Sequence, residues 1–126
     1  MAVKYNVTER GNPLNPQAPK KWYANAKSTG ETTLKALGKE ITQRSTVNHA
    51  DTLAVLEALT QVLTANLAEG KIVRFGDFGS FQVSIGSEGA ETREKFNVSF
   101  IKSKKVVFRP GVDLKEMLNN LKFEKF

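Results

Sequence analysis

The sequence predicts an α+β domain in which two helices precede an antiparallel hairpin and a short last helix. Apolar residues at helical spacing dominate residues 32–69, whereas apolar and polar residues alternate, as in strands, over much of residues 71–109. Pro110 and Gly111 then open a last stretch with helical spacing. A chain of 126 residues is long enough for one such domain with a modest core.

The composition excludes several classes of protein. The chain has no cysteine, so it forms no disulfide and carries out no thiolate chemistry. Its one histidine, His49, cannot by itself supply a metal site or a catalytic triad, and we expect no enzyme activity, metal or cofactor. No apolar run reaches the length of a membrane span and residues 1–10 lack a signal-peptide core, so we expect a cytoplasmic protein without a membrane or small-molecule partner.

The charge distribution favours a polyanionic partner. The net charge is +6 and the isoelectric point is near 9.7. Residues 1–30 carry five cations and one anion, residues 31–70 three and five, and residues 71–126 eleven and seven. The positive charge therefore lies toward both ends of the chain, on either side of a slightly acidic middle.

We divide the chain into a basic N-terminal extension, residues 1–30, and a domain over residues 31–126. Weak alternation predicts a strand over residues 2–10. Residues 11–19 contain three prolines and a glycine, which predicts a loop or extended linker. Residues 20–26 then form either a second short strand or an extended arm.

The extension carries an aromatic pair, Trp22 and Tyr23, directly after Lys20 and Lys21. Aromatic rings beside lysines can stack on nucleic-acid bases. We favour the simpler interpretation that the two rings pin the extension to the core.

Two helices are predicted next, over residues 32–44 and 49–69. In the second helix the leucines keep helical spacing: Leu53, Leu56, Leu59, Leu63 and Leu67. Asn48 is a suitable N-cap, with Asp51 in the first turn, and Gly70 is a suitable residue just past the C-terminus. In the first helix the apolar positions are Leu34, Leu37 and Ile41.

The second helix has an unusually wide apolar arc, because Val55 and Val62 extend it beyond the leucine stripe. A helix of this kind needs partners on two sides, and a small chain supplies only one of them. We therefore expect a homodimer with this helix pair at its centre.

Residues 71–85 predict a hairpin whose turn is the run 76–79, Gly-Asp-Phe-Gly. Both glycines tolerate backbone conformations that other residues avoid. Strand alternation resumes after the turn, with Phe81, Val83 and Ile85 on one face. The base of the hairpin is expected to be anchored in the core by three phenylalanines: Phe75, Phe78 and Phe81.

The rest of the chain completes this hairpin. Residues 86–97 predict a mobile tip, and residues 98–109 predict a strand. A helix to about residue 121 follows, and residues 122–126 are expected to fray, although Phe123 and Phe126 could dock. The inward residues of that helix are expected to be Leu114, Met117, Leu118 and Leu121.

This order of elements carries a resemblance to a known family. The runs Glu69-Gly70-Lys71, Gly76-Asp77-Phe78-Gly79-Ser80-Phe81 and Phe108-Arg109-Pro110-Gly111 resemble those of the bacterial histone-like HU and integration host factor family. The likeness covers roughly residues 32–121, and the 26 residues between Phe81 and Phe108 match the length of the family's two-stranded arm. It is strong because the runs occur together at this spacing.

The resemblance implies an intertwined homodimer with a helical body, a three-stranded antiparallel sheet and a protruding β-arm on each chain. Such dimers bind duplex DNA through its phosphates and minor groove, with little sequence preference, and condense DNA in the nucleoid. The turn residues Gly79 and Ser80 match a turn that meets a phosphate, and Lys71 and Lys115 are weaker candidates for contacts. The site residues implied are Arg74, Gly79, Ser80, Lys102, Lys104, Lys105 and Arg109.

The predicted arm departs from the family's pattern at its tip. Family arms usually end in Arg-Asn-Pro, whose proline wedges between base pairs, but residues 88–96 contain no proline. Residues 82–97 carry three acids and two bases, and an acidic arm is disfavoured in the negative minor groove. Phe96 could act as a wedge, but we interpret it as packing within the hairpin.

Two alternatives stay open at this point. The acidic tip and the aromatic extension also fit a protein-interaction module that shares the fold but has weak or no DNA binding. The extension could add strands to the sheet or supply DNA contacts, and the partner in the dimer could be a related chain.

Overall fold

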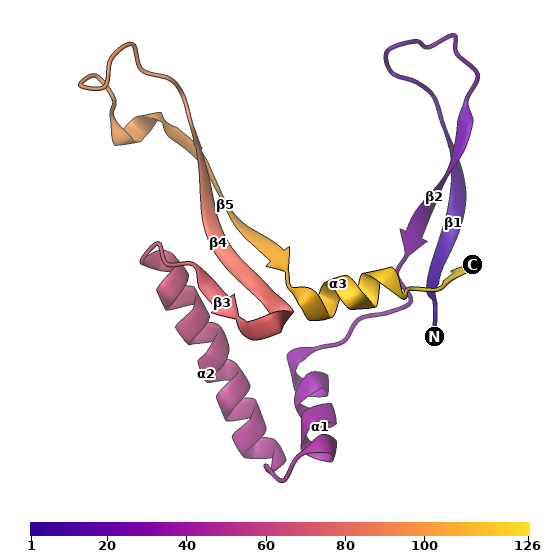
Figure 1. Ribbon diagram of the computed structural model, residues 1–126, viewed down its shortest axis with the longest axis vertical. Helices are drawn as coiled ribbons and strands as arrows, with labels where there is room; N and C mark the ends of the chain where they lie inside the picture. The colour runs from indigo at the N-terminus through magenta and orange to yellow at the C-terminus, as the bar shows by residue number, and fades with distance from the viewer. The chain divides into compact units, whose positions relative to one another are not determined.

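The computed structural model describes residues 1–126, which form two compact units. One unit contains residues 34–116, and the other combines residues 1–33 with residues 117–126. The first unit holds two helices and one three-stranded sheet, and the second holds the other three-stranded sheet (Figure 1). None of the helices combines the length and hydropathy that a membrane span requires.

Helices α1 (Leu34–Arg44) and α2 (His49–Ala68) confirm the two predicted helices, although α1 starts two residues later than expected. Local chemistry sets the ends of α2. The Asn48 side chain accepts a hydrogen bond of 2.8 Å from the backbone N–H of Asp51, and Gly70 adopts a φ of +83°. Both end signals, Asn48 and Gly70, lie next to the helix in the sequence, so the helix ends could be predicted from the residue types.

The two helices pack closely at Gly38. Gly38 is buried, and a Cβ placed on it would lie 2.8 Å from Cδ2 of Leu53 on α2. The leucine stripe of α2 is only half-buried, and no apolar side chain of the chain is fully buried. The chain on its own therefore has no closed core.

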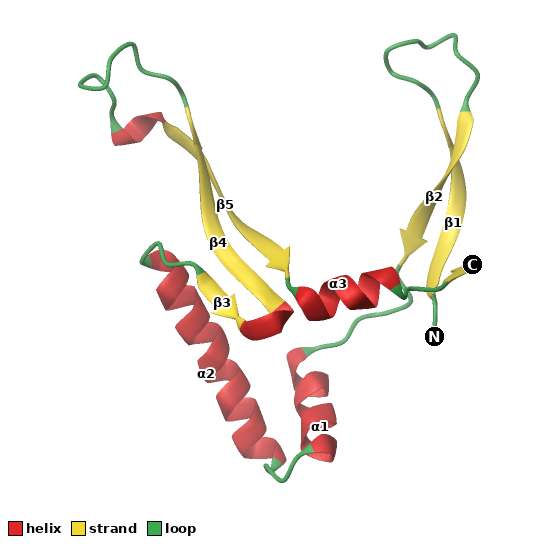
Figure 2. Cartoon of the chain, viewed as in Figure 1, coloured by secondary structure: helices red, strands yellow, loops and turns green.

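The sheet of this unit is antiparallel, with the order β3-β4-β5 (Figure 2). Its strands are β3 (Val73–Phe75), β4 (Gly79–Ser87) and β5 (Ile101–Pro110). A single 3-10 turn, residues 76–78, joins β3 to β4, with Gly76 at a φ of +57° and Gly79 at +155°. The predicted hairpin and its glycine turn are confirmed.

Phenylalanines form a continuous chain of ring contacts at the base of this sheet. The ring centroids lie 5.8 Å apart for Phe75 and Phe78, 5.7 Å for Phe78 and Phe108, and 4.8 Å for Phe81 and Phe108. Phe75 and Phe78 nevertheless stay 41% and 43% exposed. The predicted anchor is present, but the chain alone covers only part of it.

The segment between β4 and β5 differs from the prediction at one point. Residues 98–100 form a short 3-10 helix capped by Asn97, so the predicted strand begins at Ile101. The side-chain oxygen of Asn97 accepts from the N–H of Ser99, which competes with strand pairing. The Phe96 ring meets Phe100 edge-on at 5.6 Å, as expected for packing within the hairpin.

Helix α3 (Val112–Asn119) is shorter than predicted and crosses the boundary between the two units. Leu114 and Leu121 are half-buried, as expected, but Met117 and Leu118 are 47% and 51% exposed, so the prediction that all four point inward was wrong. Helix α3 has eight residues, about two turns, so only a narrow side of it can pack against a neighbouring element.

The second unit is a three-stranded sheet in the order β2-β1-β6. Strand β1 (Val3–Arg10) pairs antiparallel with β2 (Lys21–Lys27), which confirms the predicted strands and loop. Strand β6 (Phe123–Lys125) pairs parallel with β1, and the N–H of Phe126 donates to the carbonyl of Tyr5 at 2.8 Å. The expectation of a frayed tail was therefore wrong.

The expectation that Trp22 and Tyr23 pin the extension to a core was also wrong. Their side chains are 65% and 47% exposed. They point to opposite faces of β2, and the same-face neighbour of Trp22 along the strand is Ala24, too small to cover an indole. The two rings remain accessible on the hairpin.

Candidate nucleic-acid interface

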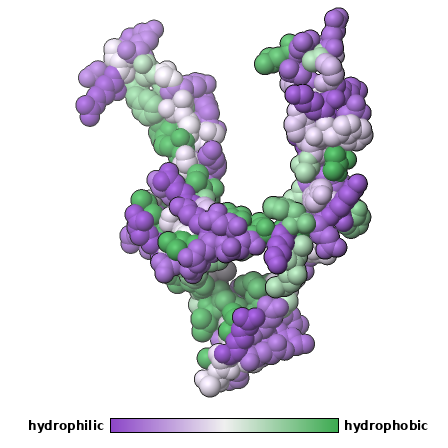
Figure 3. All heavy atoms as spheres, turned by 45° about the vertical axis from the view of Figure 1, so that its right-hand side comes forward, coloured by the Kyte–Doolittle hydropathy of each residue, from purple (hydrophilic) through white to green (hydrophobic).

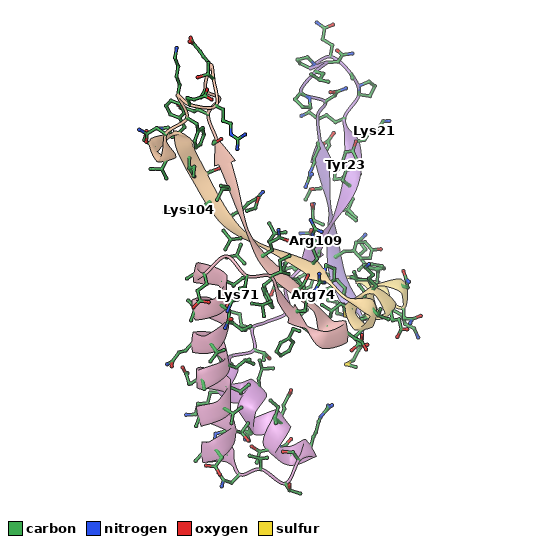
Figure 4. All side chains as sticks on the ribbon, turned by 60° about the vertical axis from the view of Figure 1, so that its left-hand side comes forward. Lys21, Tyr23, Lys71, Arg74, Lys104 and Arg109 are labelled. Atoms are coloured by element: carbon green, nitrogen blue, oxygen red, sulfur yellow. The ribbon has the colours of Figure 1, made fainter.

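Strand register brings three of the predicted site residues into one row across the sheet. Arg74 on β3 pairs with Ser80 on β4, and Ser80 pairs with Arg109 on β5. Because paired residues share a face and strands lie about 4.8 Å apart, the row spans only about 10 Å. We call this side of the sheet the arginine face; Figure 4 shows Arg74 and Arg109 near each other.

Both arginines are available for a ligand. Their side chains are exposed and have no hydrogen bond or ion pair within the chain. A guanidinium offers five donors in a planar fork that matches phosphate oxygens, and it stays charged at any ordinary pH. A hollow of about 210 Å³ lies beside them, lined by Arg74, Gly76, Gly79, Ser80, Arg109, Pro110 and Gly111.

The glycine turn fixes the shape of this hollow. A Cβ on Gly79 would lie 2.5 Å from the carbonyl oxygen of Arg109, and a Cβ on Gly111 would collide with the carbonyl of Asp77. The N–H of Gly111 donates to the carbonyl of Phe78 at 2.8 Å, which ties the turn to the end of β5. Backbones approach this closely only where side chains are absent, so both glycines hold Ser80 and Arg109 in place.

The three predicted lysines do not share one face. Pairing puts Lys105 opposite Ser84, on the arginine face, whereas Lys104 pairs with Ile85 on the face that carries Phe81. The register shifts at Gly86 and Ser87, which leaves Lys102 unpaired at a bulge. Only Lys105 therefore extends the arginine face along β5.

One of the weaker candidates, Lys71, and the arm tip contribute less positive charge. The ammonium of Lys71 lies 2.9 Å from the Glu69 carboxylate. At the tip, Lys95 lies 3.2 Å from the Glu91 carboxylate, which offsets one of the two tip cations. Both pairs are exposed and so only weakly stabilising, but each lowers the local positive field.

Comparison with known proteins shows the family to which the chain belongs. Residues 1–125 match the family model described as HU-HIG, an HU domain fused to a wHTH, Ig or glycine-rich motif. The chain belongs to the HU-HIG family. The match extends over the N-terminal hairpin and β6 as well as the helices and the arginine face of this HU-HIG chain.

A solved structure shares the fold. It is a 2.25 Å crystal structure from Bacteroides vulgatus ATCC 8482, provisionally described as a bacterial DNA-binding protein, and it superposes with a TM-score of 0.68 at 11% sequence identity. The match covers 99% of the HU-HIG chain but 48% of the other, so this chain spans about half the length of that protein. No curated protein matches the sequence.

The N-terminal hairpin arranges its cations in a way that the sequence does not reveal. The N-terminal hairpin presents Arg10 and Lys21 directly opposite each other, and Lys4 opposite Lys27. The basic composition of residues 1–30 was visible, but the register that gathers these cations on one face needs the hairpin pairing itself.

Proposed function

We propose that this chain is an architectural DNA-binding protein of the nucleoid that binds duplex DNA without sequence specificity. The observation that carries the proposal is the row of Arg74, Ser80 and Arg109 beside an open hollow. The two guanidiniums are suited to phosphate oxygens, and contacts to phosphates position a protein on DNA without reading its sequence. The role proposed is one of binding, in the cytoplasm of a bacterium, without catalysis.

The proposed binding unit is a homodimer. Helix α2 exposes a second apolar stripe, formed by Val55, Ala58, Val62 and Ala65, on a side that its own chain leaves uncovered. Val55 and Val62 are 64% and 57% exposed, and hydrophobic surface is visible over the helices in the lower part of Figure 3.

The surface area supports the same proposal. The chain exposes 10821 Å². Two separate globular proteins with the lengths of the two units would together expose about 8,000 Å². The difference between the two areas is of the order of the area that an obligate dimer buries. A second copy of the chain would cover surface of this size.

Binding is tested by fluorescence anisotropy with a labelled random-sequence duplex over a salt series. Three arginine-face cations per chain, Arg74, Lys105 and Arg109, give about six phosphate contacts per dimer, so we expect the affinity to fall at least about 1,000-fold from 50 to 200 mM salt. Two unrelated duplex sequences should bind within a few-fold of each other. Failure to bind at 50 mM salt would overturn the proposal in favour of a protein-interaction module.

Assembly is tested by introducing charge on the uncovered stripe. The double variant Val55→Glu/Val62→Glu should lose the dimer, because two buried carboxylates per chain would be unpaired at the interface. Sedimentation equilibrium should change from about twice the 14.0 kDa chain mass to the monomer mass or to an unfolded chain.

The matched control for assembly adds the same charge to the polar side of α2. Gln61→Glu/Thr64→Glu changes two exposed positions outside the apolar stripe. It should leave the dimer intact. A monomeric wild-type chain at micromolar concentration would contradict the homodimer.

A further inference from the structure

The sheet β2-β1-β6 has two chemically different faces. One face carries four cations, one anion and several polar residues: Lys4, Asn6, Thr8, Arg10, Lys21, Tyr23, Asn25, Lys27 and Glu124. The opposite face carries Val7, Trp22, Ala24 and Phe123 among its uncharged residues. We call the first of these the hairpin basic face; Figure 4 shows Lys21 and Tyr23 on β2.

This unit holds most of the net charge of the chain. Residues 1–33 and 117–126 carry seven cations and three anions, net +4, whereas the 34–116 unit carries twelve cations and ten anions, net +2. The smaller unit therefore accounts for four of the six net charges. The tip between β4 and β5 is net negative by comparison.

The hairpin register places like charges directly opposite each other at both ends. Lys4 pairs with Lys27, and Arg10 pairs with Lys21. Like charges at facing positions destabilise a β-ladder. A sheet selected only for its stability would avoid two such pairs, whereas bound anions between the cations would convert repulsion into attraction.

The chain relieves this repulsion only in part. Lys4 lies 2.8 Å from the Glu124 carboxylate, and the Lys27 ammonium lies 3.7 Å from the centroid of the Phe126 ring. Arg10 donates to Asn25 at 2.5 Å and lies 6.0 Å from the Tyr23 ring centre. The side chain of Lys21 has no hydrogen bond or ion pair.

The cations are spaced for an extended polyanion. Lys21 and Lys27 lie six residues apart on one strand face, about 20 Å at the usual rise of a strand. Over that length of the duplex axis, one DNA strand presents about six phosphates. At the loop end, Arg10, Lys21 and Tyr23 line a hollow of about 410 Å³, a concave place for a phosphate between two cations.

We infer that the hairpin basic face is a second phosphate-binding surface for duplex DNA, with Arg10, Lys21 and Lys27 as its contacts. The inference rests on the proposed DNA-binding function and adds a surface to it. The hairpin supplies the positive charge that the acidic β4–β5 tip does not.

The test is the salt series with the full chain and the triple variant Arg10→Gln/Lys21→Gln/Lys27→Gln. Loss of three contacts per chain should lower the salt-dependence slope by about 2.7 per chain and weaken binding at least tenfold at about 100 mM salt. The melting temperature should change little, because the variant removes the like-charge pairs together with the Arg10–Asn25 hydrogen bond and the Lys27–Phe126 contact. The matched control is Lys35→Gln/Lys39→Gln/Arg44→Gln, three exposed cations of α1.

A crosslinking experiment tests the face itself. The chain has no cysteine, so one introduced thiol carries a photo-crosslinker at a known place. Asn6→Cys lies on the hairpin basic face, and Val7→Cys lies next to it on the opposite face. DNA should crosslink to the first variant and much less to the second.

The outcomes separate this inference from the proposed function. If the triple variant keeps the affinity and slope of a wild-type chain that binds DNA, or if both thiols crosslink equally, the second surface is wrong and the arginine face stands. If the wild-type chain does not bind DNA at all, both ideas fall. A control variant that weakens binding as much as the hairpin variant would also overturn the inference, because net charge alone would explain it.

Discussion

Replacing both arginines of the arginine face, in the variant Arg74→Ala/Arg109→Ala, should nearly abolish binding of duplex DNA. The two side chains are exposed, lie in one row with Ser80 and have no partner within the chain, so their removal costs the fold little. A charge-assisted contact contributes about 1.5–3 kcal/mol, so losing two from each chain of the dimer should weaken binding at least about 100-fold. Anisotropy titration of a labelled duplex at fixed salt measures this directly.

The control removes the same charge elsewhere. Lys35→Ala/Lys39→Ala changes two exposed cations on α1 and should weaken binding only by the small amount that net charge explains. The conservative variant Arg74→Lys/Arg109→Lys should restore part of the affinity, since lysine keeps the charge but lacks the planar fork. Equal affinities for the alanine variant and its control would show that the DNA lies elsewhere on the protein.

Gly79→Ala should strongly destabilise the fold. Gly79 is buried at a φ of +155°, and a Cβ there would lie 2.5 Å from the Arg109 carbonyl and 2.7 Å from Cζ of Phe108. Backbone strain and the forced separation of β4 from β5 together cost about 2–4 kcal/mol. Urea unfolding at fixed protein concentration, followed by circular dichroism, should show the midpoint fall by about 1–2 M.

Two other glycines calibrate this effect. Gly89→Ala should be neutral, because its Cβ would meet nothing within 4 Å and its φ is not positive. Gly70→Ala should lose about 1 kcal/mol, since Gly70 has a φ of +83° but open space around it. If Gly79→Ala were as mild as Gly89→Ala, the close approach of the turn to β5 would be wrong.

The parts of the fold that follow from neighbours in the chain were predictable. Asn48 caps α2 through a residue three positions away, and Gly70 ends it two positions past its last residue. The Gly-Asp-Phe-Gly turn between β3 and β4 is likewise local. These elements depend on short-range hydrogen bonds and backbone preferences, which the residue types alone reveal.

The candidate site was predictable as a set of residues but only in part as an arrangement. The family motifs pointed to Arg74, Ser80 and Arg109 among other residues, and alternation along a strand places Lys104 and Lys105 on different faces of β5. The row that joins β3, β4 and β5 depends on pairing across a 35-residue span of the chain. Such pairing is set by the register of whole strands rather than by any one residue.

The sequence by itself determined the α+β class, the helix ends, the glycine turn and the excess of positive charge. Only the tertiary structure decided where that charge gathers. It joined β6 to β1 from opposite ends of the chain, and it set Arg10 against Lys21 and Lys4 against Lys27. The physical reason is that the residue type alone fixes the charge of a side chain and its preference for helix, strand or turn. Its neighbours across a sheet depend instead on hydrogen bonds between strands that are distant in the sequence.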